Sequence, residues 1–175
     1  GPYGNPYLQD YTEVKGLDNL YTASGILQKS MERAARLFGS PHCLYCVNGS
    51  TGGLLTAVFA ALQPGDTALV ARNCHKSVYN GLALRQVNVR FLMPDLDGAT
   101  GIAGSIAPER VRDALERDPK IRLVILTSPT YEGVLSDVAS ITALAHQKNV
   151  PVLVDEAHGA HLHFSKTSGV PGSAV

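Results

Sequence analysis

The stretch Val152-Leu153-Val154-Asp155-Glu156-Ala157-His158-Gly159-Ala160-His161 decides the fold, because it carries an unbroken apolar run that ends in a carboxylate. A short run of this kind is typical of a strand in a parallel sheet that is covered on both faces. Asp155 therefore follows a strand that is too apolar to be exposed, and a buried carboxylate needs a partner. The partner could be a ligand with a basic ring nitrogen, a turn that the aspartate caps, or a nearby arginine.

A second informative stretch, Asn48-Gly49-Ser50-Thr51-Gly52-Gly53, is predicted to be a turn between a strand and a helix. Free N–H groups and the helix dipole favour a phosphate at such a helix start, and the hydroxyls of Ser50 and Thr51 would add donors. Glycines let a ligand approach the backbone closely. Ordinary N-capping by Ser50 or Thr51 explains the same residues. The stretch is not a Walker A loop, because GxxxxGK[ST] occurs nowhere in the chain.

The chain as a whole alternates between predicted helices and strands. Helices are predicted at residues 26–38, 51–62, 75–86 and 137–148 and from Pro108 onward, and strands at 43–47, 67–71, 89–93, 121–126 and 151–154. This alternation, with later strands that are apolar throughout, predicts an α/β fold, a three-layer αβα domain with a mostly parallel sheet. Ligands of such sheets bind at the carboxyl ends of the strands. Residues 48–53, 73–77 and 155–158 all follow strands directly, so we expect a ligand site there.

The composition of the 175 residues argues against several classes of protein. The 15 basic and 15 acidic residues give a net charge of zero, which indicates neither a nucleic acid nor an anionic membrane as a partner. Three cysteines favour a reducing cytoplasm over a disulfide framework. Cys43 and Cys46 lie in a predicted strand, where residues three apart point to opposite faces. We therefore expect both to be core residues and not ligands of one metal.

Histidines follow two of the predicted strands. His75 begins a helix, where its imidazole could stack on a planar ring and donate to a substrate carboxylate, or could simply cap the helix. His158, His161 and His163 match no metal-ligand spacing, so they are interpreted as loop histidines and no metal is predicted. Asp-Glu-Ala-His at residues 155–158 is also the Walker B sequence of one helicase class, but that function needs the absent Walker A loop. A phosphate cradle and a buried aspartate together suit pyridoxal phosphate, which has a phosphate group and a basic ring nitrogen.

Four segments, in this order, resemble the Orn/Lys/Arg decarboxylase family, pyridoxal-phosphate enzymes of the aspartate-aminotransferase fold (fold type I). The segments are Val47-Asn48-Gly49-Ser50-Thr51, Arg72-Asn73-Cys74-His75-Lys76-Ser77, Thr127-Ser128-Pro129-Thr130-Tyr131-Glu132-Gly133-Val134 and Val154-Asp155-Glu156-Ala157-His158-Gly159-Ala160-His161. The leader Gly16-Leu17-Asp18-Asn19-Leu20 is similar to the family's approach to its first helix. The resemblance spans essentially the whole chain, and four ordered motifs are more specific than any one of them.

The resemblance implies how the cofactor would be anchored at its two ends. Ser50 and Thr51 would bind the phosphate of pyridoxal phosphate. Asp155 would pair with the pyridine nitrogen and, with His75, is a predicted catalytic residue.

The resemblance also implies which residues would surround the ring. His75 would stack on one face, Ala157 would pack on the other face, and His158 would lie beside the cofactor. Thr130 and Tyr131 would be near the site.

The family's Schiff-base lysine follows a further strand in a Ser-x-His-Lys context, which this chain does not contain. Lys76 opens a helix and Lys166 lies in a connecting loop, so neither is expected to replace it. The resemblance also implies that two later strands lie between the Asp155 strand and residues 43–47, which leaves a gap of about 10 Å. We therefore expect an inactive fragment of a larger enzyme. It would have a leader at residues 1–25 and a cofactor-binding large domain at residues 26–175 that is incomplete at its C-terminal side.

For the full-length protein, the resemblance implies decarboxylation of a basic amino acid, either arginine, lysine or ornithine. A homodimer or larger homo-oligomer is expected, because the active site of this fold lies at a dimer interface. One alternative is an aminotransferase or aldolase-like enzyme of the same fold. The other is a non-catalytic phosphate-binding α/β module.

Overall fold

The computed structural model describes residues 4–8 and 16–164, in two compact units. One unit ends at Tyr45 and the other begins at Cys46. The domain boundary predicted between residues 25 and 26 stays a prediction.

The first unit contains a short 3₁₀ helix, η1 (Pro6–Leu8), and the helix α1 (Ile26–Phe38). As predicted, α1 ends at Gly39, whose φ of 70° lies in the left-handed region that glycine adopts without strain. Its N-terminal side is organised by Asp18, whose carboxylate accepts hydrogen bonds from the N–H groups of four residues. These are Asn19, Ser24, Gly25 and Leu27, at 2.7–3.0 Å.

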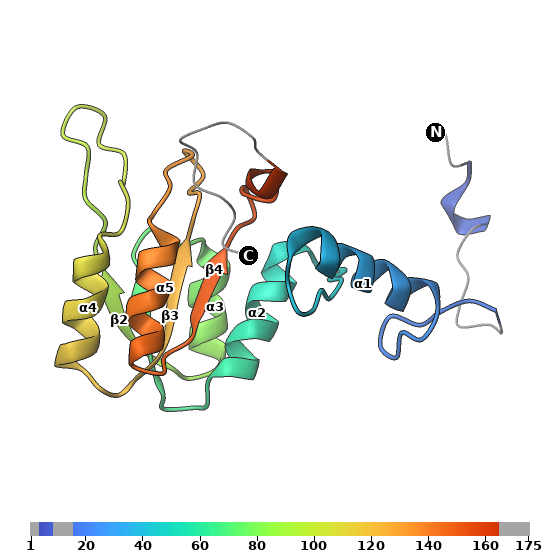
Figure 1. The fold of residues 1–175 in the computed structure, drawn as a ribbon, viewed down its shortest axis with the longest axis horizontal. Coiled ribbons are helices and arrows are strands. Elements are labelled where there is room, and N and C mark those ends of the chain that lie inside the picture. The colour runs from blue at the N-terminus through green and yellow to red at the C-terminus, as the bar shows by residue number, and fades with distance from the viewer. Residues whose placement is uncertain (1–3, 9–15, 165–175) are drawn as a thin grey trace. The chain divides into compact units, whose positions relative to one another are not determined.

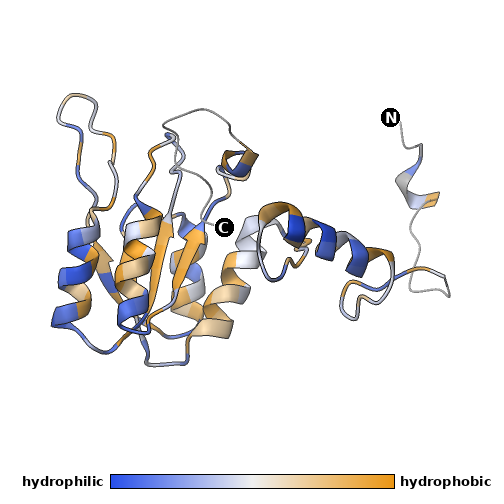
Figure 2. Ribbon diagram, viewed as in Figure 1, coloured by the Kyte–Doolittle hydropathy of each residue, from blue (hydrophilic) through white to orange (hydrophobic). Residues whose placement is uncertain are grey.

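The second unit is built on a four-stranded parallel sheet in the order β2-β1-β3-β4. The strands are β1 (Thr67–Ala71), β2 (Asn88–Leu92), β3 (Ile121–Thr127) and β4 (Val152–Asp155). Every residue of β1 is buried, as are most of β3, because both strands lie in the middle of the sheet. The hydropathy colouring shows the central strands as the apolar layer, whereas the outer face of α4 (Pro108–Arg117) is polar (Figure 2).

Helices cover both faces of this sheet (Figure 1). The helices α2 (Gly49–Ala61) and α3 (Lys76–Leu84) pack against each other on one face, and α4 and α5 (Val138–Gln147) pack against each other on the other. The connections between parallel strands are right-handed, so the direction in which the chain moves along the sheet decides which face each connecting helix covers. The chain moves one way from β1 to β2, and the opposite way from β2 to β3 and on to β4, so α3 lies on one face and α4 and α5 lie on the other. The predicted three-layer α/β fold is confirmed.

Local signals placed several helix starts correctly. Pro108 occupies the first turn of α4, where its missing N–H is not needed. Asp137 caps α5 by accepting a hydrogen bond from the N–H of Ser140 at 3.0 Å. His75 caps α3, one of the two roles considered for it.

The predicted strand at residues 43–47 is wrong, and so is the prediction that Cys43 and Cys46 are core residues. The segment is not assigned to a strand, Cys43 is half-buried, and Cys46 is exposed. A strand exists only when a neighbouring strand completes its hydrogen bonds, and the described sheet offers these residues no partner. The strand β4 lies at the edge of the described sheet, and the predicted two-strand gap beyond it stays a prediction.

Among residues 4–8 and 16–164, no helix is both long and apolar enough to cross a membrane. The same residues hold no group of three or more His, Cys, Asp or Glu side chains arranged for a metal ion.

Candidate active site

The carboxyl edge of the sheet brings together the segments that follow β1, β3 and β4. The last residues of β3 and β4, Thr127 and Asp155, are paired in register, so their side chains lie on the same face of the sheet. The N–H of Ser128 donates to the carbonyl oxygen of Asp155 at 3.1 Å, which continues the ladder one residue past β3. The N-terminal end of α2, with Ser50 and Thr51, lies at the same end of this unit (Figure 1).

Asp155 is 5% exposed, as its position after an apolar strand predicts. Its Oδ1 accepts a hydrogen bond from the N–H of Ala157 at 3.1 Å, so the carboxylate does cap its own turn. None of the ion pairs among the described residues includes Asp155, and its second oxygen has no hydrogen-bond partner among them. The arginine partner considered above is therefore absent from the described chain, and one carboxylate oxygen is left for a ligand.

Cys74 lies next to Asp155 on this edge. Burial, together with the negative charge of Asp155, raises the pKa of the Cys74 thiol to about 11. The hydroxyl of Thr127 acts on the thiol in the opposite direction.

His75 has an exposed ring whose orientation is fixed by the start of α3. Its Nδ1 accepts a hydrogen bond from the N–H of Ser77 at 3.3 Å and lies 2.8 Å from the Ser77 hydroxyl. Because Nδ1 acts as an acceptor, the hydrogen-bond network assigns the proton of the neutral ring to Nε2. That N–H is available to a ligand.

The loop after β3 and the turn after β4 contact each other at the rim of the site. The rings of Tyr131 and His158 meet edge to face, with centroids 5.6 Å apart, and both side chains are exposed. Gly159 packs closely against the loop after β3: a Cβ at this position would lie 2.6 Å from Cδ of Pro129. Ala157 is exposed at the same turn.

Ser50 and Thr51 are exposed in the first turn of α2. The N-cap residue is Asn48, and it makes no side-chain capping hydrogen bond. The first backbone hydrogen bond of the helix runs from the N–H of Gly52 to the carbonyl of Asn48. The N–H groups ahead of Gly52 are therefore not capped by a side chain, which suits an anion at this helix start.

Two buried polar atoms of the described residues lack an ordinary hydrogen-bond partner. They are Oδ1 of Asn73 and Oγ1 of Thr127. Thr127 has only the Cys74 thiol beside it, and a thiol bonds weakly. Both lie at this edge, Asn73 just after β1 and Thr127 at the end of β3. Buried polar groups are normally satisfied, so their concentration here indicates a site that a polar ligand or water completes.

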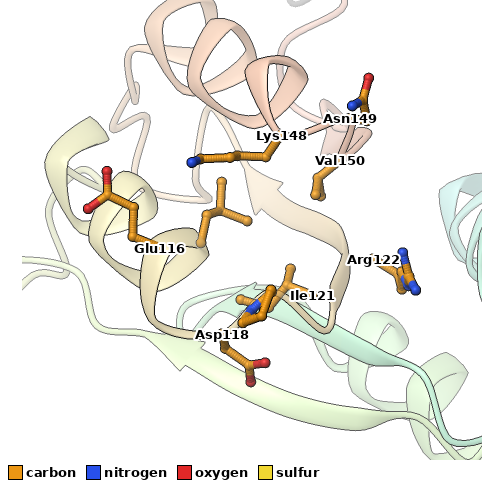
Figure 3. Close-up of a pocket in the computed structure, with 9 residues that line it drawn as sticks. Glu116, Asp118, Ile121, Arg122, Lys148, Asn149 and Val150 are labelled. Carbon is orange, nitrogen blue, oxygen red and sulfur yellow. The ribbon is translucent and has the colours of Figure 1, made fainter.

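Two cavities lined by described residues lie at the opposite edge of the sheet, where the strands begin. One of about 460 Å³ is formed where β3 begins and where α4 and α5 end (Figure 3). Glu116, Asp118, Arg122 and Lys148 line it, and none of the predicted site residues does.

The three-layer α/β fold of this chain is shared with solved structures. The structure of Escherichia coli constitutive lysine decarboxylase matches with a TM-score of 0.68 and 25% identity, over 81% of this chain and 22% of that one. N-succinyldiaminopimelate aminotransferase from Mycobacterium tuberculosis matches with a TM-score of 0.61 and 20% identity, over 82% of this chain and 38% of that one. The second match shows the fold alone.

The family model for the major domain of Orn/Lys/Arg decarboxylases matches residues 3–169, so the chain belongs to that family. It is 38% identical over 155 residues to an arginine decarboxylase of Bacillus subtilis, covering 89% of this chain and 32% of that protein. It is 42% identical over 152 residues to the B. subtilis protein YaaO, covering 87% of this chain and 32% of that protein. The chain spans about a third of the length of these relatives. The predicted family and fold type are confirmed.

Orn/Lys/Arg decarboxylases use pyridoxal phosphate, and the solved structure of cystalysin from Treponema denticola, which shares the fold, contains this cofactor. The described residues fit that cofactor, because a buried carboxylate with a free oxygen and an uncapped helix start lie at the same end of one sheet. The individual roles of Ser50, Thr51, His75, Asp155, Ala157 and His158 stay predictions.

Sequence reasoning missed several residues of this edge. Cys74 and Thr127 adjoin Asp155, and Tyr79 contacts the turn before His75. The only signal for Thr127 is a lone polar residue at the end of an apolar strand. Lys76 is the exposed first residue of α3, and Lys166 lies outside the described residues.

Proposed function

We propose that this chain is the N-terminal part of the catalytic domain of a pyridoxal-phosphate-dependent decarboxylase of arginine, lysine or ornithine, with the Schiff-base lysine elsewhere in the full-length protein. Relatives that cover most of the chain are named arginine decarboxylases, which supports this substrate class. We further propose that the full-length protein is a cytoplasmic homodimer or larger homo-oligomer.

The observation that carries the proposal is the state of Asp155. Its carboxylate is buried, has no cationic partner among the described residues, and keeps one oxygen free. A ring nitrogen that carries a proton would satisfy this oxygen and would in turn be held protonated by it. Bound pyridoxal phosphate supplies an electron sink for the carbanion left by the departing carboxyl group, and protonation of the ring strengthens that sink.

The other residues would hold the cofactor in place. The hydroxyls of Ser50 and Thr51, with the uncapped N–H groups of α2, would bind the phosphate group. The imidazole of His75 would lie against the ring, and its Nε2–H would donate to the substrate carboxylate. Oδ1 of Asn73, which has no hydrogen-bond partner among the described residues, would find one there, and Oγ1 of Thr127 would find a stronger partner than the Cys74 thiol.

The experiment is to express the full-length protein, add pyridoxal phosphate, and measure release of carbon dioxide from arginine, lysine and ornithine separately. We expect one of the three to be decarboxylated, with an absorbance band of the bound cofactor. Production of a keto acid without carbon dioxide would replace the proposal with an aminotransferase. Absence of cofactor absorbance, with retained binding of phosphate compounds, would replace it with a binding module.

A further inference from the structure

The turn between β1 and α3, residues 72–75, is tied to the helix that follows it by one hydroxyl group. Tyr79 lies one turn into α3 and reaches back to the end of β1. Its Oη is 2.8 Å from the carbonyl oxygen of Arg72 and 3.1 Å from that of Ala71. A phenol has one proton, so the two carbonyls share one donor. The hydroxyl thus links α3 to the backbone at the end of β1.

The ring of Tyr79 is held in turn by its neighbours. The guanidinium carbon of Arg72 lies 5.6 Å from the Tyr79 centroid and 5.3 Å from the Phe91 centroid. The two rings are 6.2 Å apart and tilted by 57°. The N–H of Arg72 donates to the carbonyl of Leu92 at 2.8 Å, so the backbone of Arg72 is bound on both sides, by β2 and by Tyr79.

The Tyr79 hydroxyl remains a donor at neutral pH. Burial raises the pKa of Tyr79 above its ordinary value, and Cys74 adds to this effect. At neutral pH the hydroxyl therefore keeps the proton that the two carbonyls share.

The turn that Tyr79 holds carries Asn73, whose Oδ1 lacks a partner, and His75, whose ring orientation follows from the backbone of residues 75–77. We propose that Tyr79 is a positioning residue, whose hydroxyl sets the height and tilt of the His75 imidazole over the ring of pyridoxal phosphate. This inference rests on the proposed function. Tyr79 does not itself touch the cofactor or the substrate.

The test uses the full-length protein and the substitution Tyr79→Phe, which removes the hydroxyl and keeps the ring between Arg72 and Phe91. We expect amide hydrogen exchange in residues 72–77 to rise about tenfold, with exchange in β3 unchanged, because the hydrogen bond from the Tyr79 hydroxyl to the turn is lost locally. We also expect the dissociation constant for pyridoxal phosphate to rise roughly fivefold. The circular dichroism of the bound cofactor band should change, because it reports the tilt of the ring.

Two further variants separate positioning from general stability. Tyr45→Phe removes a tyrosine hydroxyl that lies 2.7 Å from Oγ of Ser30 in the other unit, and it should leave all three readouts unchanged. p-Aminophenylalanine at position 79 restores an N–H donor and should recover exchange, affinity and dichroism towards the unmodified values. If Tyr79→Phe also raises exchange in β3, the comparison with p-aminophenylalanine decides whether the donor is the cause.

Unchanged exchange in residues 72–77 of Tyr79→Phe would overturn the inference. Raised exchange with unchanged cofactor affinity and dichroism would overturn it as well, since the turn would then not position the site. If the unmodified protein itself binds no pyridoxal phosphate, the proposed function fails, and the inference fails with it. Failure of the inference alone is seen when the unmodified protein binds pyridoxal phosphate and only the Tyr79 variants fail to behave as expected.

Discussion

Asp155 is held in place by its own turn and has no partner on its second oxygen among the described residues. Because the N–H of Ala157 can donate equally well to an amide oxygen, an asparagine would keep the turn while losing the negative charge. Replacing Asp155 with asparagine therefore tests the role of the negative charge without disturbing the turn.

We predict that Asp155→Asn in the full-length protein lowers the rate of decarboxylation roughly a hundredfold or more, because the charge that keeps the ring nitrogen protonated is lost. The measurement is kcat for carbon dioxide release, with thermal unfolding as the check on folding. The matched control is Asp137→Asn, which changes the cap of α5 to another good capping residue and should retain activity. Equal activities of the two variants would contradict the role of Asp155.

Cys74 should differ sharply from the other two cysteines in its reaction with alkylating reagents. The pKa of its thiol rises from 9.0 to about 11, so its reactive thiolate is roughly a hundredfold scarcer at pH 8, and the side chain is buried as well. We predict that mass spectrometry of a briefly alkylated protein finds label at Cys43 and Cys46 and at Cys74 only after unfolding. Equal labelling of all three would contradict the burial of Cys74.

The raised pKa of Cys74 also makes the stability of the fold depend on pH. Between pH 9 and about 11 the unfolded chain loses the Cys74 proton while the folded chain keeps it. The free energy of unfolding should therefore fall as the pH rises through this window.

At the scale of elements, α1 depends on a carboxylate that lies outside it. The N–H groups of Ser24, Leu27, Asn19 and Gly25 lower the pKa of Asp18 from 3.8 to about 2. A lowered pKa stabilises the folded form above pH 3.8, and this contribution is lost as the pH falls towards 2.

We predict that the start of α1 loosens over that acidic window, seen as movement of the amide NMR signals of Ser24, Gly25 and Leu27. Asp18→Ala should produce the loosened state already at neutral pH, and Asp18→Asn, which keeps one acceptor oxygen, should be intermediate. Signals that do not move between pH 5 and pH 2 would show that Asp18 does not organise this segment.

The turn after β4 depends on the absence of a side chain at Gly159. A Cβ there would lie 2.6 Å from Pro129 and 2.7 Å from Glu156, closer than real Cβ contacts. We predict that Gly159→Ala destabilises the full-length protein by about 1–3 kcal/mol and displaces the His158 side of the rim. Thermal unfolding measures the first effect and cofactor affinity the second. Gly98→Ala is the control, because a Cβ at that position meets nothing within 4 Å, and an equal loss there would contradict the packing argument.

The elements that sequence predicted well are those whose signals are local. Gly39, Pro108 and Asp137 act on the helix that they adjoin, so the residues around each one were sufficient. The strand expected at residues 43–47 failed because a strand needs a partner that its own residues cannot supply. Asp18 was missed for a related reason, since three of the N–H groups that it binds come from residues six to nine positions later.

The candidate site shows the same division. The apolar residues just before Asp155 predict that it is buried, and in the structure it is buried. Its proximity to Cys74 and Thr127 depends on the register between strands that are far apart in the sequence, which composition does not encode. The Tyr79 hydroxyl bonds depend on where α3 begins relative to β1 and were not foreseen.

At the scale of the whole molecule, β4 is the critical edge of the sheet. Its residues Val152, Leu153 and Val154 are apolar but only half-buried, and among the described residues no strand pairs with its other side. Exposed apolar edges of sheets tend to pair with other chains. We predict that a polypeptide of these 175 residues self-associates with increasing concentration, as measured by light scattering, whereas the full-length protein does not associate through β4. A monomeric 175-residue polypeptide at high concentration would contradict this.

The position of Asp155 on the last strand of the described sheet also matters during translation. β1, β2 and β3, with the turn that carries His75, leave the ribosome before β4 does, and domains generally fold in the order of their synthesis. The carboxylate proposed to pair with the ring nitrogen is thus added to a sheet whose other three strands are already made. If the proposed roles hold, a nascent chain that has not yet released residue 155 has the residues for the coenzyme's phosphate but not the partner for its nitrogen.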